Sequence, residues 1–277
     1  MKNIDRRKNL KPREFRQWYL IPSKPVIITD FADIWPAKSR WTPQYFKKNY
    51  GHIEVPVYSK NFIRPGKNYM AADRTMKLGD YLELIEANEQ TDLRLFLFNI
   101  FKHAPELKQH FYRPDIMGGF MMRLPLMFFG CAGSSVPLHY DVDLSHVFHT
   151  QFYGTKRVVL YPPDQSVKLY RHPFTVRTPV DVDNPDLKKY PRFKEVDGYE
   201  DELQPGETLF IPTAYWHLMH YTSGGFAMSL RSNESIIRMI RGVYNIAFKV
   251  TFDKAMNRAL GQKWNEVKER IAVRRAG

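Results

Sequence analysis

The sequence predicts a mainly β protein with flanking helices, built around an antiparallel jelly-roll core. Between residues 124 and 231, seven short apolar segments are separated by Gly, Pro, Asn or Asp, as in β-sandwiches and barrels. On either side of that region, apolar residues recur at helical spacing. With 277 residues, 43% of them hydrophobic, the chain can bury a sizeable core and is not a disordered chain. We therefore expect an N-terminal α/β segment over 1–123 that packs on the core, a core over 124–232 with an insert at 170–202, and C-terminal helices over 233–277.

Short helices and strands alternate in the N-terminal segment. Apolar residues follow the helical period in three stretches, and Thr42 precedes one of them as a capping residue. Three other stretches are short runs of β-branched and aromatic residues, typical of strands. We expect helices over 12–20, 42–50 and 76–87, and strands over 25–29, 52–59 and 93–98. These helices are expected to flank a sheet edge.

The core segments have the length and composition of buried strands. Gly154 and the Gly224-Gly225 pair occur where hairpin turns are expected, so each turn is predicted to fold its two flanking strands against one another. The insert at 170–202 is too long for a hairpin loop and is expected to cover the barrel mouth. A terminal pair of helices is expected over 235–248 and 253–273. The predicted core strands lie within 124–130, 136–143, 147–154, 155–163, 206–212, 215–222 and 224–231.

The composition also limits compartment and partners. Lysine and arginine number 42 against 29 aspartate and glutamate, a net charge of +13 that favours an anionic partner or gives a solvated basic surface. Much of that charge lies near the termini, in 1–13 and 263–275. A single cysteine, Cys131, and the lack of a secretory signal favour the cytoplasm. Gly, Pro and His interrupt the two longest uncharged runs, 124–140 and 208–230, so we expect no membrane span.

Three residues form a candidate metal site. His139 and Asp141 are two apart in a strand-like segment, so both side chains are expected on one face. His217 begins another strand and can supply a third ligand from the facing sheet. Two histidines and one carboxylate can hold one face of an Fe(II) ion and leave positions open. The alternative is a hydrogen-bonded structural pair, because such a triplet often occurs by chance.

Three further residues are candidates for binding a small ligand. Lys156 begins an otherwise apolar strand and shares a face with Val158 and Leu160, so it either reaches solvent or meets an anion inside the barrel. An ordinary Asp or Glu is the alternative anion. Arg231 is expected near the metal set or in an anion-binding position, with a surface ion pair as the alternative. Phe128 is expected to wall the pocket together with Leu126, unless each is a plain core residue.

The ordered motifs of the core resemble those of a known family. The stretches VPLHYDVDLSHVFHTQFYGTKRVVLYPPDQ, GYEDELQPGETLFIPTAYWHLMHY and GGFAMSLR are similar to the JmjC or cupin-like oxygenases, which include an asparaginyl hydroxylase and a tRNA wybutosine-synthesis hydroxylase. The likeness is strong over 124–231, and 24–46 is similar to the usual N-terminal segment of these proteins. The resemblance implies a double-stranded β-helix core and an enzyme that uses Fe(II) with 2-oxoglutarate as cosubstrate. It makes His139, Asp141 and His217 the iron ligands and assigns the distal carboxylate of 2-oxoglutarate to Lys156.

The chain departs from the family pattern at positions near the cosubstrate. Family enzymes often have a threonine three residues before the first histidine, where this chain has Val136. An asparagine expected four residues before Gln151 is replaced by Val147, and a second asparagine late in the last core strand is replaced by Arg231. These departures concern the substrate and the details of cosubstrate binding, whereas the triad and Lys156 are intact.

The resemblance implies a dioxygenase that hydroxylates a protein side chain or an RNA base and releases succinate and CO2. Demethylation starts from the same oxidation of a C–H bond, and the sequence does not distinguish the two outcomes. The alternatives are a cupin-type module that binds a metal or ligand without catalysis, and a metal-dependent cupin isomerase. A homodimer is a further expectation, formed through apolar residues of the C-terminal helices, namely Ala255, Leu260, Trp264, Val267 and Ile271.

Overall fold

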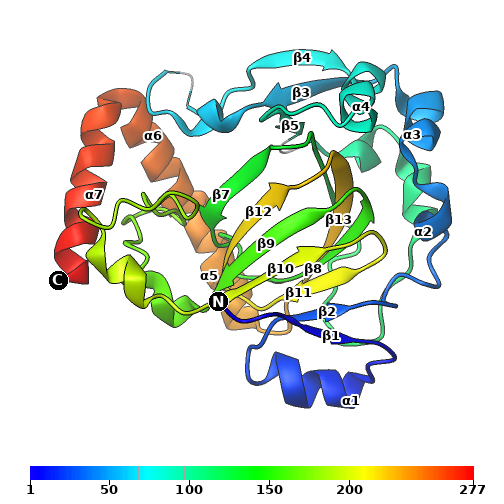
Figure 1. The fold of residues 1–277 in the computed structure, drawn as a ribbon, viewed down its shortest axis with the longest axis horizontal. Coiled ribbons are helices and arrows are strands. Elements are labelled where there is room, and N and C mark those ends of the chain that lie inside the picture. The colour runs from blue at the N-terminus through cyan, green and yellow to red at the C-terminus, as the bar shows by residue number, and fades with distance from the viewer. Residues whose placement is uncertain (68, 96–97) are drawn as a thin grey trace.

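Two β-sheets pack face to face in the computed structural model, which describes residues 1–67, 69–95 and 98–277 (Figure 1). In the larger sheet the spatial order is β1 (Asp5–Arg7), β2 (Val26–Ile28), β11 (Thr208–Ile211), β8 (His146–Tyr153), β13 (Gly225–Ser232), β6 (Leu126–Gly130), β5 (Arg94–Leu95), β3 (Glu54–Tyr58) and β4 (Arg74–Lys77). In the smaller sheet it is β10 (Tyr199–Leu203), β9 (Lys156–Tyr161), β12 (Trp216–Tyr221) and β7 (Ser135–His139). The predicted jelly-roll core is confirmed, because all seven predicted core segments contain strands.

The alternation of side chains along β9 explains how the two sheets meet. Val158 and Leu160 point toward the larger sheet and join a core cluster with Val147, Leu209 and Ile211. Their neighbours Val159 and Tyr161 lie in a different cluster on the outer face of the smaller sheet. A strand that is buried on both faces needs apolar residues at consecutive positions, which is why this segment reads as a continuous apolar run.

Both predicted hairpins are wrong. Gly154 joins β8 of the larger sheet to β9 of the smaller sheet, and the Gly224-Gly225 turn joins β12 of the smaller sheet to β13 of the larger one. As a result, β13 pairs with β6 and β8, while β12 pairs with β7 and β9. Short turns therefore carry the chain between sheets, and residue Arg231 is not paired with the His217 strand.

Two strands differ from expectation in other ways. β10 overlaps the C-terminal end of the predicted insert. Its sequence, YEDEL, contains no run of apolar residues, and only Leu203 is buried. The predicted strand over 93–98 is represented by β5 at Arg94–Leu95, and the rest of that prediction falls partly on 96–97, outside the described residues. Pairing across the sheet, rather than local composition, makes β10 a strand, since it bonds to β9 along its whole length.

In Figure 1, α2 (Pro36–Arg40) and α3 (Pro43–Tyr50) lie on the right and α4 (Leu78–Glu86) lies beside β3 and β4, whereas α1 (Pro12–Phe15) lies at the bottom, next to β1 and β2 at the other end of the larger sheet. Thr42 caps α3 as predicted, since its hydroxyl oxygen accepts from the backbone N–H of Tyr45 at 3.1 Å. The first predicted helix continues from α1 into one turn of π-helix over Arg16–Leu20.

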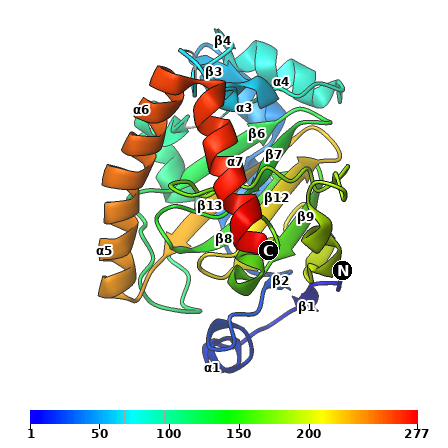
Figure 2. The same cartoon turned by 90° about the vertical axis from the view of Figure 1, so that its left-hand side faces the viewer.

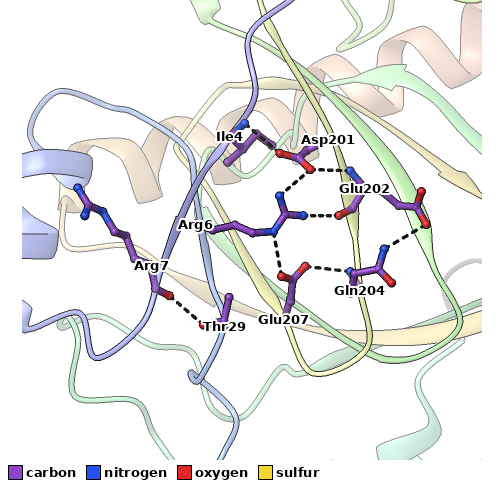
Figure 3. A network of polar contacts seen from close by, with 8 residues as sticks. All are labelled: Ile4, Arg6, Arg7, Thr29, Asp201, Glu202, Gln204 and Glu207. Carbon is purple, nitrogen blue, oxygen red and sulfur yellow. Dashed lines mark hydrogen bonds and ion pairs between the residues drawn. The ribbon is translucent and has the colours of Figure 1, made fainter.

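A polar network joins the N-terminal strand to residues 201–207, which lie far along the sequence (Figure 3). The guanidinium of Arg6 donates to Asp201 at 2.8 Å, to Glu207 at 3.0 Å and to the carbonyl of Glu202 at 2.6 Å. The Ile4 N–H donates to the other carboxylate oxygen of Asp201 at 3.1 Å. β1, an edge strand of only three residues, is therefore held by side chains as well as by its parallel pairing with β2.

The C-terminal helices form a hairpin along the side of the core away from α2 and α3 (Figure 2). One long helical stretch comprises α5 (Ile236–Tyr244), a π-helical turn over Asn245–Val250, and α6 (Thr251–Leu260). The chain reverses at Gly261, whose φ of 54° favours glycine, and α7 (Gln262–Ala276) runs back. The terminal pair is confirmed, but its break lies at Gly261 rather than between 248 and 253. Among the described residues, no helix is both long and apolar enough to cross a membrane.

The insert contacts both the smaller sheet and the C-terminal hairpin. Phe193 and Val196 pack on Tyr161 and Trp216 of the smaller sheet's outer face, and Tyr190 packs on Ala272 of α7. At its N-terminal end, Arg177 forms an isolated backbone bridge with His139. The insert therefore connects the C-terminal hairpin to the strand that carries His139.

Candidate metal centre

Three side chains converge where β7 and β12 lie side by side. His139 is the last residue of β7, His217 stands opposite it on β12, and Asp141 follows two residues after β7. The ring centroids of the two histidines are 4.3 Å apart. One ligand atom from each of the three residues lies within 4.8 Å of the others. The structure thus brings together the set predicted from sequence, although Asp141 reaches it from a loop and not from the strand itself.

Backbone carbonyls orient both imidazoles. The Nδ1 atom of His139 lies 2.8 Å from the carbonyl oxygen of Pro137, and Nδ1 of His217 lies 3.1 Å from that of Tyr215. Because a carbonyl oxygen only accepts, each Nδ1 carries the proton and donates. Each Nε2 is left with a free lone pair, the arrangement typical of a metal-binding histidine.

The third member is a carboxylate held by an arginine. Arg231 donates to Oδ1 of Asp141 at 3.1 Å and to Oδ1 of Asp143 at 2.6 Å. Burial disfavours the ionised form of Asp141, but Arg231 and then the two imidazoles outweigh it, so the pKa of this carboxyl lies below its ordinary value. Burial and the neighbouring His217 lower the pKa of His139 to about 3. Two imidazoles and one carboxylate, at the spacing found here, fit a divalent iron ion.

The loop that carries Asp141 rests on α5. Asn245 donates to the carbonyl of Val142 at 3.2 Å. A Cβ added to Gly242 would lie 2.3 Å from the carbonyl oxygen of Asp143, closer than real Cβ atoms approach such an atom. Glycine at this position therefore lets the helix touch the loop directly.

A cavity of about 160 Å³ lies between the two sheets and includes all three residues in its wall. Lys156 enters this cavity from β9 and is 1% exposed. Its Nζ donates to Nε2 of His149 at 2.9 Å and lies 4.3 Å from the centroid of the Tyr221 ring. His149 in turn has its Nδ1 at 2.8 Å from the hydroxyl of Ser229. Since Nε2 accepts from the ammonium, Nδ1 donates, and the lysine is held by a neutral imidazole.

No protein carboxylate contacts Lys156 in the described part of the chain. Burial lowers the pKa of its ammonium well below the ordinary value. Burial, followed by the charge of Lys156, likewise keeps the pKa of His149 well below its ordinary value. The expected alternative, an ion pair with an ordinary Asp or Glu, is therefore wrong. An anion that enters the cavity would raise this pKa again and stabilise the charged ammonium.

The remaining residues near the triad lie either in the cavity wall or in the core. Phe128 lies in the cavity wall with its ring centroid 5.8 Å from that of His149, and Leu126 also lies there. Trp216 is fully buried elsewhere and donates through Nε1 to Ser166. Of the two histidines near the triplet, only His149 faces the cavity, as strand alternation predicts. His146 points away and accepts from the Thr213 N–H at 3.1 Å.

Sequence reasoning missed Arg94, which lies in the cavity wall on β5. Its segment, LRLFLF, reads as an ordinary buried strand. The available signal was the same as for Lys156, namely a cation within an apolar run. No neighbouring motif drew attention to it.

A jelly-roll whose inner cavity holds two histidines and a carboxylate defines the class of non-haem iron oxygenases. A family model described as "Cupin-like domain" matches residues 12–253. The chain belongs to this cupin-like family and to its JmjC-related group of Fe(II)- and 2-oxoglutarate-dependent oxygenases.

The chain is similar to curated proteins with different names. It is 30% identical over 226 residues to lysine-specific demethylase 8 of Xenopus tropicalis, covering 78% of this chain and 49% of that protein. It is 30% identical to lysine-specific demethylase JMJ30 of Arabidopsis thaliana, covering 84% and 56%. Identity to tRNA wybutosine-synthesizing protein 5 of Gallus gallus is 28%, covering 76% and 70%. The chain thus spans about half the length of the first two relatives.

Proposed function

We propose that this protein is a dioxygenase that hydroxylates a protein side chain, with 2-oxoglutarate as cosubstrate and release of succinate and CO2. The observation that carries the proposal is the pairing of two features in one cavity: a two-histidine, one-carboxylate set and a buried lysine without an anionic partner. The first suits Fe(II), and the second suits the distal carboxylate of a dicarboxylic acid.

Each residue has a distinct task in this proposal. His139 and His217 offer Nε2 to the metal, and Asp141 offers the carboxylate oxygen that Arg231 does not hold. When bound, the iron supplies the oxidation chemistry that couples decarboxylation of the cosubstrate to attack on a C–H bond. Lys156 orients the cosubstrate from the other end, and His149 holds Lys156 in place. Phe128 and Leu126 keep water away from the cavity.

The test avoids the unknown substrate. Fe(II) and then 2-oxoglutarate are titrated anaerobically into metal-free protein, and the visible charge-transfer band of the chelate is followed. We expect a band in the wild type, none in Asp141→Ala, and a band in Lys156→Ala that needs at least about ten times more cosubstrate, because a charge-assisted contact is lost.

Metal binding without a band would contradict the proposal. It would instead favour the cupin-type binding module or the cupin isomerase, neither of which needs oxygen or 2-oxoglutarate. Succinate formation in air, measured with and without added substrate, distinguishes an oxygenase from the binding module and the isomerase, since only an oxygenase consumes the cosubstrate.

An RNA base is the second candidate substrate, favoured by the net charge of +13. If RNA binds, its affinity falls steeply as salt rises, because released counterions dominate the binding free energy. A flat salt response would remove RNA from consideration. Formaldehyde release from a methylated substrate would identify demethylation, the activity printed in the names of two relatives.

A further inference from the structure

Arg94 presents an unused pair of donors inside the cavity. Its side chain is 2% exposed and lies in the cavity wall. Nη1 donates to the carbonyl oxygen of Ser135, whereas Nε and Nη2 have no hydrogen-bond partner among the described residues. Nε and Nη2 lie on one edge of the guanidinium, which is the fork that binds both oxygens of a carboxylate.

Leaving these donors unpaired is costly for the folded protein. A buried polar N–H without a partner loses its hydration and gains nothing, and the charge of the guanidinium increases that cost. Burial lowers the pKa of Arg94 to about 10, so the group is still charged at neutral pH. Its flat face rests on Phe62, with 4.7 Å between the guanidinium carbon and the ring centroid, which leaves the edge available.

Arg94 lies at the same end of the cavity as Lys156. Ser135, which accepts from Arg94, begins β7, and His139 ends that strand at the metal set. Tyr221 stands opposite Lys156 in the ladder between β12 and β9. Burial raises the pKa of the Tyr221 hydroxyl, and the charge of Arg94 opposes that rise, which places the guanidinium near this ring. The cavity thus has a metal end, at His217, and a basic end beside Tyr221, which lies four residues further along β12.

The carboxylates near the cavity are already committed. Asp141 and Asp143 both accept from Arg231. Val136, on the same wall, offers no hydrogen-bond donor or acceptor from its side chain. Asp92 is near enough to act electrostatically on Arg94, but its hydrogen bond is to the backbone N–H of Lys60. Among the described residues no carboxylate is hydrogen-bonded to Lys156 or Arg94, so the carboxylate of a ligand would satisfy both.

We propose that Arg94 is a specificity residue that binds the distal carboxylate of the cosubstrate through Nε and Nη2, on the side opposite Lys156. This inference rests on the proposed function. The planar fork takes both oxygens at once, whereas the ammonium of Lys156 acts as a point charge. Together they select a keto acid with a second carboxylate over one that ends in a methyl group.

The experiment compares two ligands in the full-length, Fe(II)-loaded protein without oxygen. 2-Oxopentanoate has the length and keto acid of 2-oxoglutarate but lacks the distal carboxylate. Dissociation constants for both are measured from the charge-transfer band and by calorimetry. Arg94→Met should weaken 2-oxoglutarate about 30- to 100-fold, as expected for two hydrogen bonds to a charged group, and should change 2-oxopentanoate less than about twofold.

Two further variants secure the interpretation. Arg94→Lys keeps the charge but not the fork, so its loss for 2-oxoglutarate should be smaller, about tenfold, and it covers the case in which the methionine variant does not fold. Arg157→Met is the matched control. Arg157 also lies on a core strand, but it pairs with Glu200 and Asp183, each at 2.5 Å, and is not in the cavity wall. It should leave the discrimination between the two ligands unchanged.

The outcomes separate this inference from the proposed function. In one outcome the wild type shows the band, and the Arg94 variants bind 2-oxoglutarate as tightly as the wild type. Arg94 then does not contact the cosubstrate. Equal losses for both ligands would also overturn the inference, since they would indicate general damage to the cavity. A wild type that gives no band with 2-oxoglutarate overturns the proposed function itself.

Discussion

Arg231 shows how one residue can combine two of the roles that its sequence position allowed. Its ion pairs are not on the surface, because its side chain and those of Asp141 and Asp143 are largely buried. By holding Oδ1 of Asp141, it leaves the other oxygen for a metal. The metal set could be predicted because His139 and Asp141 are close in sequence. Arg94 could not, since a single arginine in an apolar strand carries no spacing information.

Replacing Arg231 should weaken metal binding more than cosubstrate binding. Arg231→Met releases the Asp141 carboxylate, and loss of such a supporting contact typically costs 10- to 100-fold in metal affinity, so we expect a decrease of about that size. Calorimetry with Fe(II) or Co(II) measures it. Asp143→Asn, which keeps an acceptor for Arg231 but removes the other negative charge, should have a smaller effect. If metal affinity is unchanged and 2-oxoglutarate binding falls, Arg231 binds the anion instead, as the sequence also allowed.

At the scale of elements, local patterns predicted the strands but not their partners. Turns at Gly154 and Gly224 have hairpin composition, yet each crosses between sheets because the jelly-roll pairs strands distant in sequence. β10 was missed because its residues are charged and its stability comes from β9. Helix caps were predictable, as at Thr42, since they depend on residues only three positions apart. Contacts such as that of α5 with the Asp141 loop have no local signature.

A methyl group on α5 should disturb the metal set without touching a ligand. In Gly242→Ala the new Cβ meets the carbonyl oxygen of Asp143 at 2.3 Å, so either the helix or the loop moves. We expect metal affinity to fall about tenfold or more, since ligand geometry must be held within about half an ångström. Arg241→Ala is the control, because this neighbouring residue of α5 is exposed to solvent. Unchanged metal affinity in Gly242→Ala would mean that the loop adapts.

For the whole molecule, the sequence predicted the terminal helices, but one residue of the expected subunit interface is buried within the chain. Trp264 is 6% exposed and donates to the buried Asp253 at 2.9 Å, whereas Leu260, expected at the same interface, is 46% exposed. Nine further large apolar side chains are exposed on the stretch from α5 to α6. They are Ile236, Ile237, Met239, Ile240, Val243, Tyr244, Ile246, Phe248 and Phe252, between 44% and 75% exposed.

We propose that a second copy of the chain covers this face. Contiguous apolar surface of this kind is rare on monomers, and a twofold axis would let the same helix meet its own copy. Light scattering should give twice the chain mass of 32.8 kDa at micromolar concentration. The variant Ile240→Glu with Val243→Glu should be monomeric, whereas Ile34→Glu, at an isolated residue 76% exposed, should not change the mass. A wild-type mass of one chain would contradict the proposal.

Stability should decrease in weak acid. Burial, and then the nearby charges of Arg238 and Lys268 respectively, lower the pKa values of His146 and His172 from 6.5 to about 4. Below pH 6.5 the unfolded chain takes up protons that the folded protein does not, so the stabilisation is complete above pH 6.5 and is lost as the pH falls toward 4. Each histidine accounts for about 3 kcal/mol over that interval.

Urea unfolding at pH 7.5, 6 and 5 measures this loss. His172→Gln should make the dependence on pH shallower, and His52→Gln, at an exposed residue, should not alter it. Equal stability at pH 7.5 and 5 would show that these imidazoles take up protons in the folded state.

Opposite faces of helix α5 contact the Asp141 loop and solvent, and this arrangement has a thermodynamic consequence. Gly242 of α5 and Asn245, the residue after it, contact the loop of Asp141. The side chains of Ile240 and Val243 face outward. If self-association holds the helix, and with it the loop, in the position that binds metal, linkage requires metal binding to favour self-association by the same free energy. Iron loading would then tighten subunit association, and dilution of the protein would release iron. The metal content of the protein would therefore depend on the protein's own concentration.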